Sequence, residues 1–98
     1  MSSKAELVRT INESVDEYNA LMEPVCTLPQ DTIAWEDAKK SQEAAQDKGA
    51  AAIVELSEKM VELSGKTVTD LHARWMIRGV TKKLTESLAS LLTAAQEQ

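Results

Sequence analysis

The strongest constraint on the fold is a regular spacing of apolar residues near the start of the chain. Over nearly three heptads these residues recur alternately three and four positions apart, which places them all on one face of an α-helix. They are Val8, Ile11, Val15, Tyr18, Met22 and Val25. Ser3 followed by Glu6 forms a capping box at the start. Because proline disfavours helical conformation in the residue before it, Pro24 marks the end. We therefore predict a helix over residues 3–23.

The composition favours helices throughout the chain. The sequence contains 3 glycines, 2 prolines and no phenylalanine. β-sandwiches and barrels need turn-forming residues at short intervals and strands rich in aromatic residues. The chain's 98 residues are enough for one domain and its core. We therefore predict an all-α fold in a single helical domain over residues 1–98.

A second, long helix is predicted from residue 33 to residue 63 or 64. Asp31 or Thr32 is the expected N-cap, and Gly65 is the expected C-terminal glycine. The preceding segment 24–30 holds both prolines and is expected to be a connector.

The two halves of this second helix carry different side chains. The first half has a stripe of alanines, Ala38, Ala45 and Ala52, whereas residues 53–63 carry large apolar residues three and four positions apart. An alanine stripe allows close approach of a neighbouring helix but buries little area. Gly49 costs about 1 kcal/mol relative to alanine in a helix. The alternative is therefore a break at Gly49, which would give four helices instead of three.

A third helix is predicted over residues 68–95, after a capping box formed by Thr67 and Asp70. Gly79 is a candidate kink in it. Its apolar residues are mostly four apart, so the stripe drifts around the helix, which is typical of globular packing or of contact with two partners. We expect an antiparallel bundle. The surplus apolar surface of the third helix predicts a homodimer or a protein partner.

The charge and the single cysteine bear on the compartment in which the chain works. The formal net charge is −5, and Cys26 has no second cysteine with which to form an internal disulfide. We find no apolar run of transmembrane length and no secretory-signal pattern. We expect a cytoplasmic protein without membrane association.

Residues suited to catalysis or metal binding are few. His72 is the single histidine, so one chain assembles neither a zinc site nor a di-iron site built on Glu-x-x-His pairs; we expect it at the surface. Cys26 lies between Glu23 and Asp31, which disfavour a reactive thiolate, and we expect a half-buried structural thiol. The sequence has no phosphate-binding loop, dinucleotide fingerprint or nucleophile elbow. It therefore predicts no cofactor, no identifiable small-molecule substrate and no enzymatic activity.

Basic residues gather in the last third of the chain. Their spacing of four predicts one stripe along the third helix, made of Arg74, Arg78 and Lys82 with Lys83 beside it. Asp70 and Glu86 lie four residues beyond its two ends, so the simplest interpretation is ion pairing within the helix. The alternatives are an acidic protein surface and, less favoured in so acidic a chain, the phosphates of a nucleic acid.

The two tryptophans are the most informative single residues. Trp75 shares a face with Leu71 and is predicted to lie in the core. Trp35 lies at the start of the second helix, two residues after Ile33. It either staples the end of the bundle, which we favour, or is an exposed anchor, since tryptophan is enriched at binding hot spots.

These observations favour a small acidic protein-interaction module, such as an adaptor, a chaperone or an inhibitor that acts by binding a protein partner or a second copy of itself. The candidate partner-binding residues are Trp35, Arg74, Arg78, Lys82 and Lys83. Two alternatives stay open. One is a dimeric nucleic-acid-binding regulator that uses the basic stripe. The other is a small helical enzyme with its site at a subunit interface.

Overall fold

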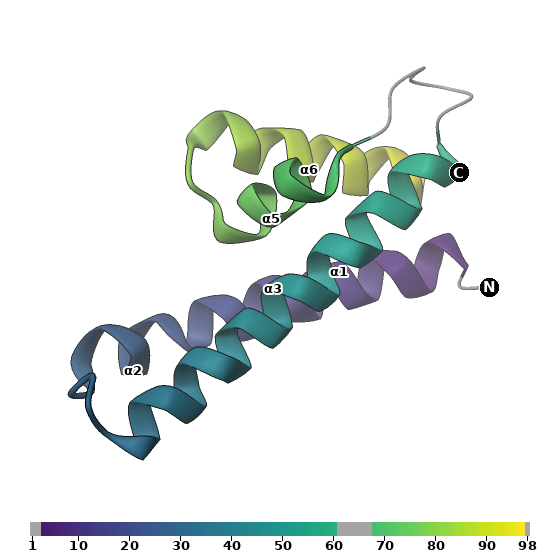
Figure 1. Cartoon of the computed structure of the whole chain (residues 1–98). Helices are drawn as coiled ribbons and strands as arrows, with labels where there is room; N and C mark the ends of the chain where they lie inside the picture. The colour runs from purple at the N-terminus through teal and green to yellow at the C-terminus, as the bar shows by residue number, and fades with distance from the viewer. Residues whose placement is uncertain (1–2, 61–67, 98) are drawn as a thin grey trace.

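The computed structural model describes residues 3–60 and 68–97, and these residues form helices without any strand. The helices are α1 (Lys4–Ala20), α2 (Met22–Thr27), α3 (Ile33–Lys59), α5 (Asp70–Arg78) and α6 (Lys82–Gln96) (Figure 1). The predicted all-α fold is confirmed. Over the same residues, no helix is both long enough and apolar enough to cross a membrane.

Four of these helices begin with the same local device. A hydroxyl side chain accepts a hydrogen bond from the backbone N–H three residues further on, which satisfies a donor that the helix itself leaves unpaired. The four N-cap residues are Ser3, Thr32, Thr69 and Thr81, with oxygen–nitrogen distances of 3.1, 3.2, 3.2 and 3.1 Å. The predicted N-cap Ser3 is confirmed, and of the two candidates Asp31 and Thr32 the second is the N-cap of α3. The third predicted helix begins instead after Thr69; Thr67 lies outside the described residues.

The first helix is shorter than predicted, and the chain after it is more helical. α1 ends at Ala20, and Leu21 joins it to α2, which contains Pro24. Proline is tolerated in the first turn of a helix because the N–H that it lacks would have no partner there. The predicted connector over residues 24–30 is therefore wrong for residues 24–27, and residues 28–32 link α2 to α3.

α3 runs without interruption through Gly49, so the alternative of a break there is wrong. A β-carbon at this position would lie 2.6 Å from Cδ1 of Ile77 on α5 and 2.8 Å from Cβ of Ser14 on α1. The glycine therefore lets three helices approach one another closely. Ala45 and Ala52 of the alanine stripe are also buried, as expected for close packing. α3 ends at Lys59, while the predicted C-terminal residues 63–65 lie outside the described part of the chain.

The single third helix predicted over residues 68–95 is wrong, because the chain turns at Gly79. This glycine has φ 62° and ψ 40°, in the left-handed region, and its N–H donates to the carbonyl oxygens of Trp75 and Met76. A left-handed glycine ends a helix by satisfying its last carbonyl groups. Thr81 then caps α6. At the predicted kink one helix therefore ends and a second begins.

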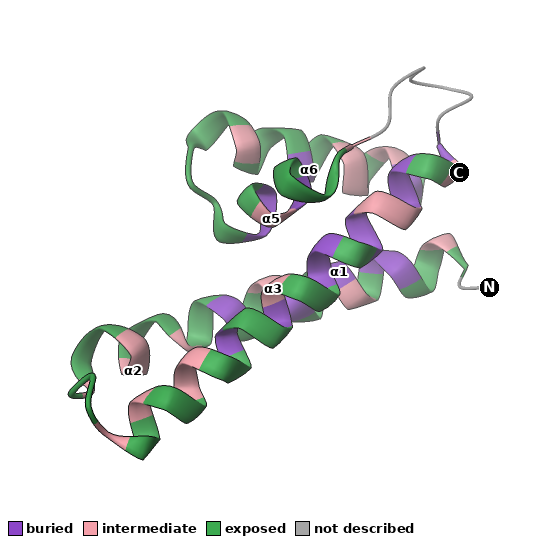
Figure 2. Cartoon of the chain, viewed as in Figure 1, coloured by how far each residue is buried: buried purple, intermediate pink, exposed green. Residues whose placement is uncertain are grey.

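α1 and α3 lie side by side and run in opposite directions, and α5 and α6 lie together on one side of this pair (Figure 1). The largest fully buried side chains come from three of these helices: Ile11, Ile53, Leu56 and Ile77. α2, at the other end, buries no residue. Figure 2 shows the buried residues toward the middle and the C-terminal end of α3. The core is therefore uneven along a molecule that measures 47 × 28 × 19 Å.

Gly49→Ala is expected to lower the free energy of unfolding. Overpacking costs about 1–3 kcal/mol, and the higher helix propensity of alanine returns only about 1 kcal/mol. Urea denaturation measures the change. Adding Ile77→Val removes the Cδ1 atom in the way, so the double variant should lose less than the sum of the two single losses. Stabilisation by Gly49→Ala alone would contradict the close approach.

Gly79→Ala is expected to destabilise the chain by about 1–2 kcal/mol, because an L-residue is strained in the left-handed region. No clash contributes, since the added β-carbon would meet only Oγ1 of Thr85, at 3.6 Å. Gly79→Asn is the matched control, because asparagine tolerates this conformation and should lose less. Equal losses for the two variants, measured by urea denaturation, would contradict a left-handed residue here.

Candidate functional site

α5 presents three lines of side chains. Ala73, Met76 and Ile77 are buried in the core. Arg74 and Arg78 form a second line, and Leu71 and Trp75 form a third, each with a spacing of four residues. With 3.6 residues per turn, the basic line lies between the buried line and the third line. One short helix thus brings a basic edge next to a second apolar face.

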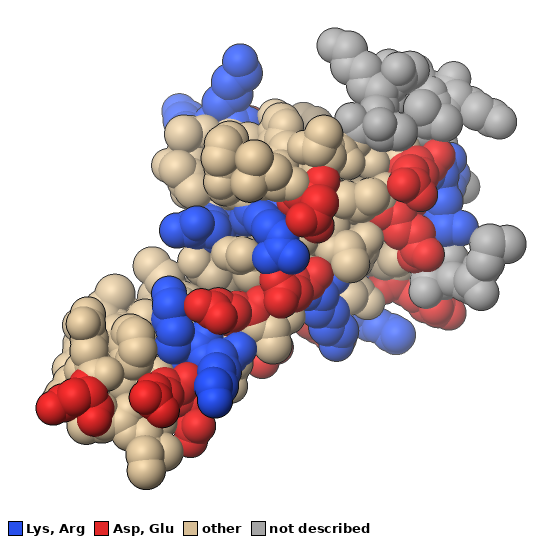
Figure 3. All heavy atoms as spheres, in the orientation of Figure 1, with Lys and Arg blue, Asp and Glu red and all other residues tan. Residues whose placement is uncertain are grey.

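This second apolar face is open to solvent. Leu71, Trp75 and Val80 are 58%, 45% and 59% exposed, and Leu84 of α6 is half-buried beside them. Together with Thr69, His72 and Thr81 these residues line a hollow of about 490 Å³ between α5 and α6, which we call the apolar groove. Figure 3 shows uncharged surface over α5 and α6, with Lys and Arg side chains above and below it and acidic side chains beside the lower ones.

The prediction that Trp75 lies in the core is wrong. Its helix buries the line of Ala73, Met76 and Ile77, and Trp75 lies on the far side of the helix from that line. Leu71, which shares its face, is exposed with it. The tryptophan is therefore a large apolar side chain at the surface, and such residues in a contiguous patch mark binding sites.

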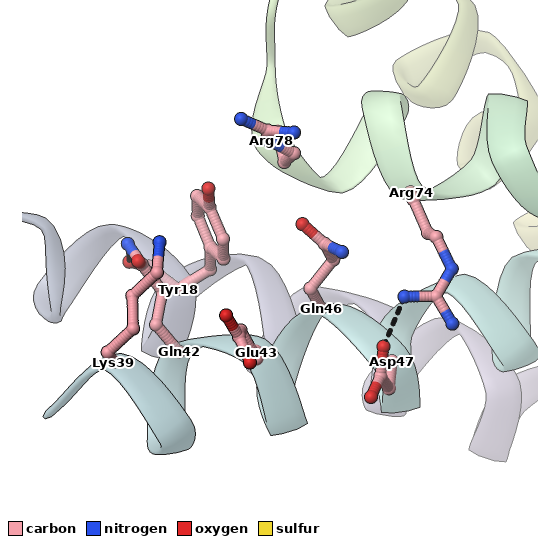
Figure 4. A pocket seen from close by; sticks show the side chains of 8 residues that line it. All are labelled: Tyr18, Lys39, Gln42, Glu43, Gln46, Asp47, Arg74 and Arg78. Carbon is pink, nitrogen blue, oxygen red and sulfur yellow. Dashed lines mark hydrogen bonds and ion pairs between the residues drawn. The ribbon is translucent and has the colours of Figure 1, made fainter. Parts of the chain in front are cut away.

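Arg74 and Arg78 line a different hollow, the polar groove of about 370 Å³ between α1, α3 and α5 (Figure 4). The other residues that line it are Tyr18, Lys39, Gln42, Glu43, Gln46 and Asp47. Acidic and basic side chains both face this groove. Its charges therefore compensate one another, and it does not present a surface of a single sign.

Arg74 is already engaged within the chain. Its guanidinium pairs with Asp47 of α3 through Nη1 and with Asp70 of α5 through Nε, 2.9 Å from Oδ2 (Figure 4). Side-chain hydrogen bonds to Asp70 and Asp47 raise the pKa of Arg74. The predicted pair between Asp70 and Arg74 is confirmed. Arg74 thus joins α5 to α3, and its charge is compensated.

The predicted continuous basic stripe is wrong, because Gly79 divides it. Arg78 is near the end of α5, whereas Lys82 and Lys83 are the first two residues of α6. All three are exposed. Among the residues that the structure describes, the side chains of these three make no hydrogen bond or ion pair. These three cations, and not Arg74, are available to a partner.

Trp35 lies at the opposite end of the molecule and ties two helices together. It is half-buried, and its indole Nε1–H donates to the carbonyl oxygen of Val25 on α2 at 2.9 Å. This is the stapling role that the sequence favoured. The neighbouring Ile33 and Met22 are 77% and 44% exposed.

The remaining candidates contribute no constellation of catalytic or metal-binding groups. His72 is exposed, as predicted. Cys26 is also exposed, so the prediction of a half-buried thiol is wrong; it belongs to α2, a helix that buries no residue. In residues 3–60 and 68–97 no three His, Cys, Asp or Glu side chains gather as metal ligands would.

Residue patterns alone pointed to Trp35 and the basic stripe but missed the apolar groove. Its residues are Leu71, Trp75, Val80 and Leu84. The sequence did hold a sign of a second apolar face, because residues 71–77 carry apolar side chains on two sides of the helix. A short helix that packs on one side buries only one of these faces. The missing information was which line faces the core.

Comparisons with protein-family models, with curated proteins and with solved structures found no match to this chain.

The different environments of the two tryptophans predict different accessibility to a fluorescence quencher. With Trp35→Phe, the remaining Trp75 should be quenched readily by acrylamide, because it is 45% exposed. With Trp75→Phe, the remaining half-buried Trp35 should be quenched less. Steady-state fluorescence of both variants measures this. Equal quenching would contradict the placement of Trp75.

Proposed function

We propose that this chain is a small protein-interaction module and that the apolar groove is its contact surface. The observation that carries the proposal is the joint exposure of Leu71, Trp75 and Val80 around one hollow. Full burial of a fully exposed large apolar side chain is favourable by about 1.5–3 kcal/mol, and these side chains, about half exposed, would gain part of it on contact with a partner. Tryptophan is also the residue type most enriched among binding hot spots. An adaptor, a chaperone or an inhibitor would use such a surface.

The proposal includes the arrangement and compartment that the sequence predicts, namely an antiparallel helical bundle that works in the cytoplasm. A homodimer through the same surface is the alternative occupant. Trp75 replaces Trp35 as the candidate anchor for a partner. The indole N–H of Trp35 is already hydrogen-bonded within the chain. Arg78, Lys82 and Lys83 are kept as partner-binding residues.

The two other functions receive less support. A nucleic-acid-binding regulator would use a continuous row of cations, and here Gly79 divides the row and Arg74 is paired with acidic residues. An enzyme site between subunits would need charged groups that are free to act on a substrate. Arg74 is instead paired with acidic residues of α3 and α5 in its own chain.

The proposal is tested by affinity capture from lysate of the source cell with three forms of the chain. The wild-type chain is expected to retain a partner that Trp75→Ser loses, because removal of a hot-spot tryptophan weakens binding about 30-fold or more. Ile33→Ser is the matched control, since Ile33 is also an exposed apolar residue but lies outside the groove. Circular dichroism checks that each variant is folded. Retention that is identical for all three forms would reject the proposal.

A further inference from the structure

We infer that the occupant of the apolar groove is an amphipathic α-helix of a partner protein, with acidic residues along the edges of its apolar face. This inference rests on the proposed function and specifies the chemistry of the partner. It is carried by the charge around the groove and by the shape of the groove.

The segment that lines the groove carries a net positive charge although the chain as a whole is acidic. Residues 69–84, which include all the residues that line the groove, contain four basic residues and one acidic residue, Asp70, in a chain of net charge −5. Asp47 and Asp70 compensate Arg74. Arg78, Lys82 and Lys83 remain exposed. These exposed cations favour a partner that carries carboxylates, although the chain as a whole is acidic.

The shape of the groove fits a helix. Its walls come from two helices, with Leu71 and Trp75 one turn apart on α5 and Leu84 on α6. α5 has nine residues, so it is about 13 Å long at 1.5 Å per residue. That length matches two to three turns of a partner helix, whose apolar side chains at positions i, i+3, i+4 and i+7 enter such a groove.

The same observations disfavour other occupants. A symmetric dimer through this groove would place the surface of one copy against the same surface of the other. Such a dimer would gather Arg78, Lys82 and Lys83 of both copies in one interface, and this concentration of positive charge is unfavourable. A helix that lies on a membrane surface presents an apolar face along its own length, whereas Leu71 and Trp75 of α5 and Leu84 of α6 come from two helices divided at Gly79.

Two synthetic amphipathic peptides of about 18 residues test the inference. They share one leucine-rich face and carry either glutamate or lysine along its edges, with a fluorescent label at one end. Binding to the full chain is followed by fluorescence anisotropy. The glutamate peptide should bind about tenfold more tightly than the lysine peptide, since three exposed cations contribute modestly each. Its advantage should decrease as salt is added.

Two sets of variants locate the effect. Trp75→Ser should abolish binding of the glutamate peptide. The triple variant Arg78→Gln, Lys82→Gln, Lys83→Gln should keep some binding but lose the preference for glutamate. The matched control, Arg9→Gln, Lys40→Gln, Lys48→Gln, removes three other exposed cations, from α1 and α3, and should keep the preference.

The opposite outcomes overturn the inference. If the two peptides bind with equal affinity and Trp75→Ser abolishes binding of both, the partner helix need not be acidic. The apolar groove would still stand as the binding surface. Failure of both peptides to bind would also reject the inference. Binding of phosphatidylserine vesicles in place of peptide, or a dimer in sedimentation that Trp75→Ser dissolves, would assign the groove to a different occupant. The proposed function fails separately, when capture from lysate does not depend on Trp75.

Discussion

Three helices meet at Gly49 with no room for a β-carbon between them, and the rest of the structure depends on this junction. Ser14 of α1 and Ile77 of α5 both approach the glycine. Such close packing excludes larger side chains, because protein interiors leave few voids and tolerate little overpacking. The junction therefore fixes which face of α5 points to the core, and this face carries Ala73, Met76 and Ile77.

This orientation of α5 decides what the molecule shows to a partner. Once the inward line is set, helical geometry places Leu71 and Trp75 outward, with the two arginines of α5 between the two faces. Arg74 reinforces the arrangement by bridging to Asp47 of α3, and Gly79 then turns the chain so that Leu84 comes beside the exposed face. The apolar groove is thus a consequence of how the core is packed, and the proposed function depends on both.

The uneven core has a related consequence. The fully buried isoleucines and leucine lie where α1, α3 and α5 meet, whereas α2 buries nothing and is held to α3 partly by the indole of Trp35. Regions with few buried apolar contacts open more easily than a packed core. A partner bound at α5 and α6 would therefore contact the part of the molecule that adjoins the best-packed core.

The sequence by itself determined the all-α class, the N-cap Ser3 and the choice of Asp31 or Thr32 as the next N-cap, because these depend on residues close together in the chain. It also revealed that the last third carries surplus apolar surface. The tertiary structure decided that α3 continues through Gly49, that Trp75 faces outward and that Gly79 divides the basic stripe. A glycine is compatible with a close approach, a kink or a helix end. Which of these occurs depends on neighbours distant in sequence, such as Ser14 and Ile77 around Gly49, and local spacing does not specify them.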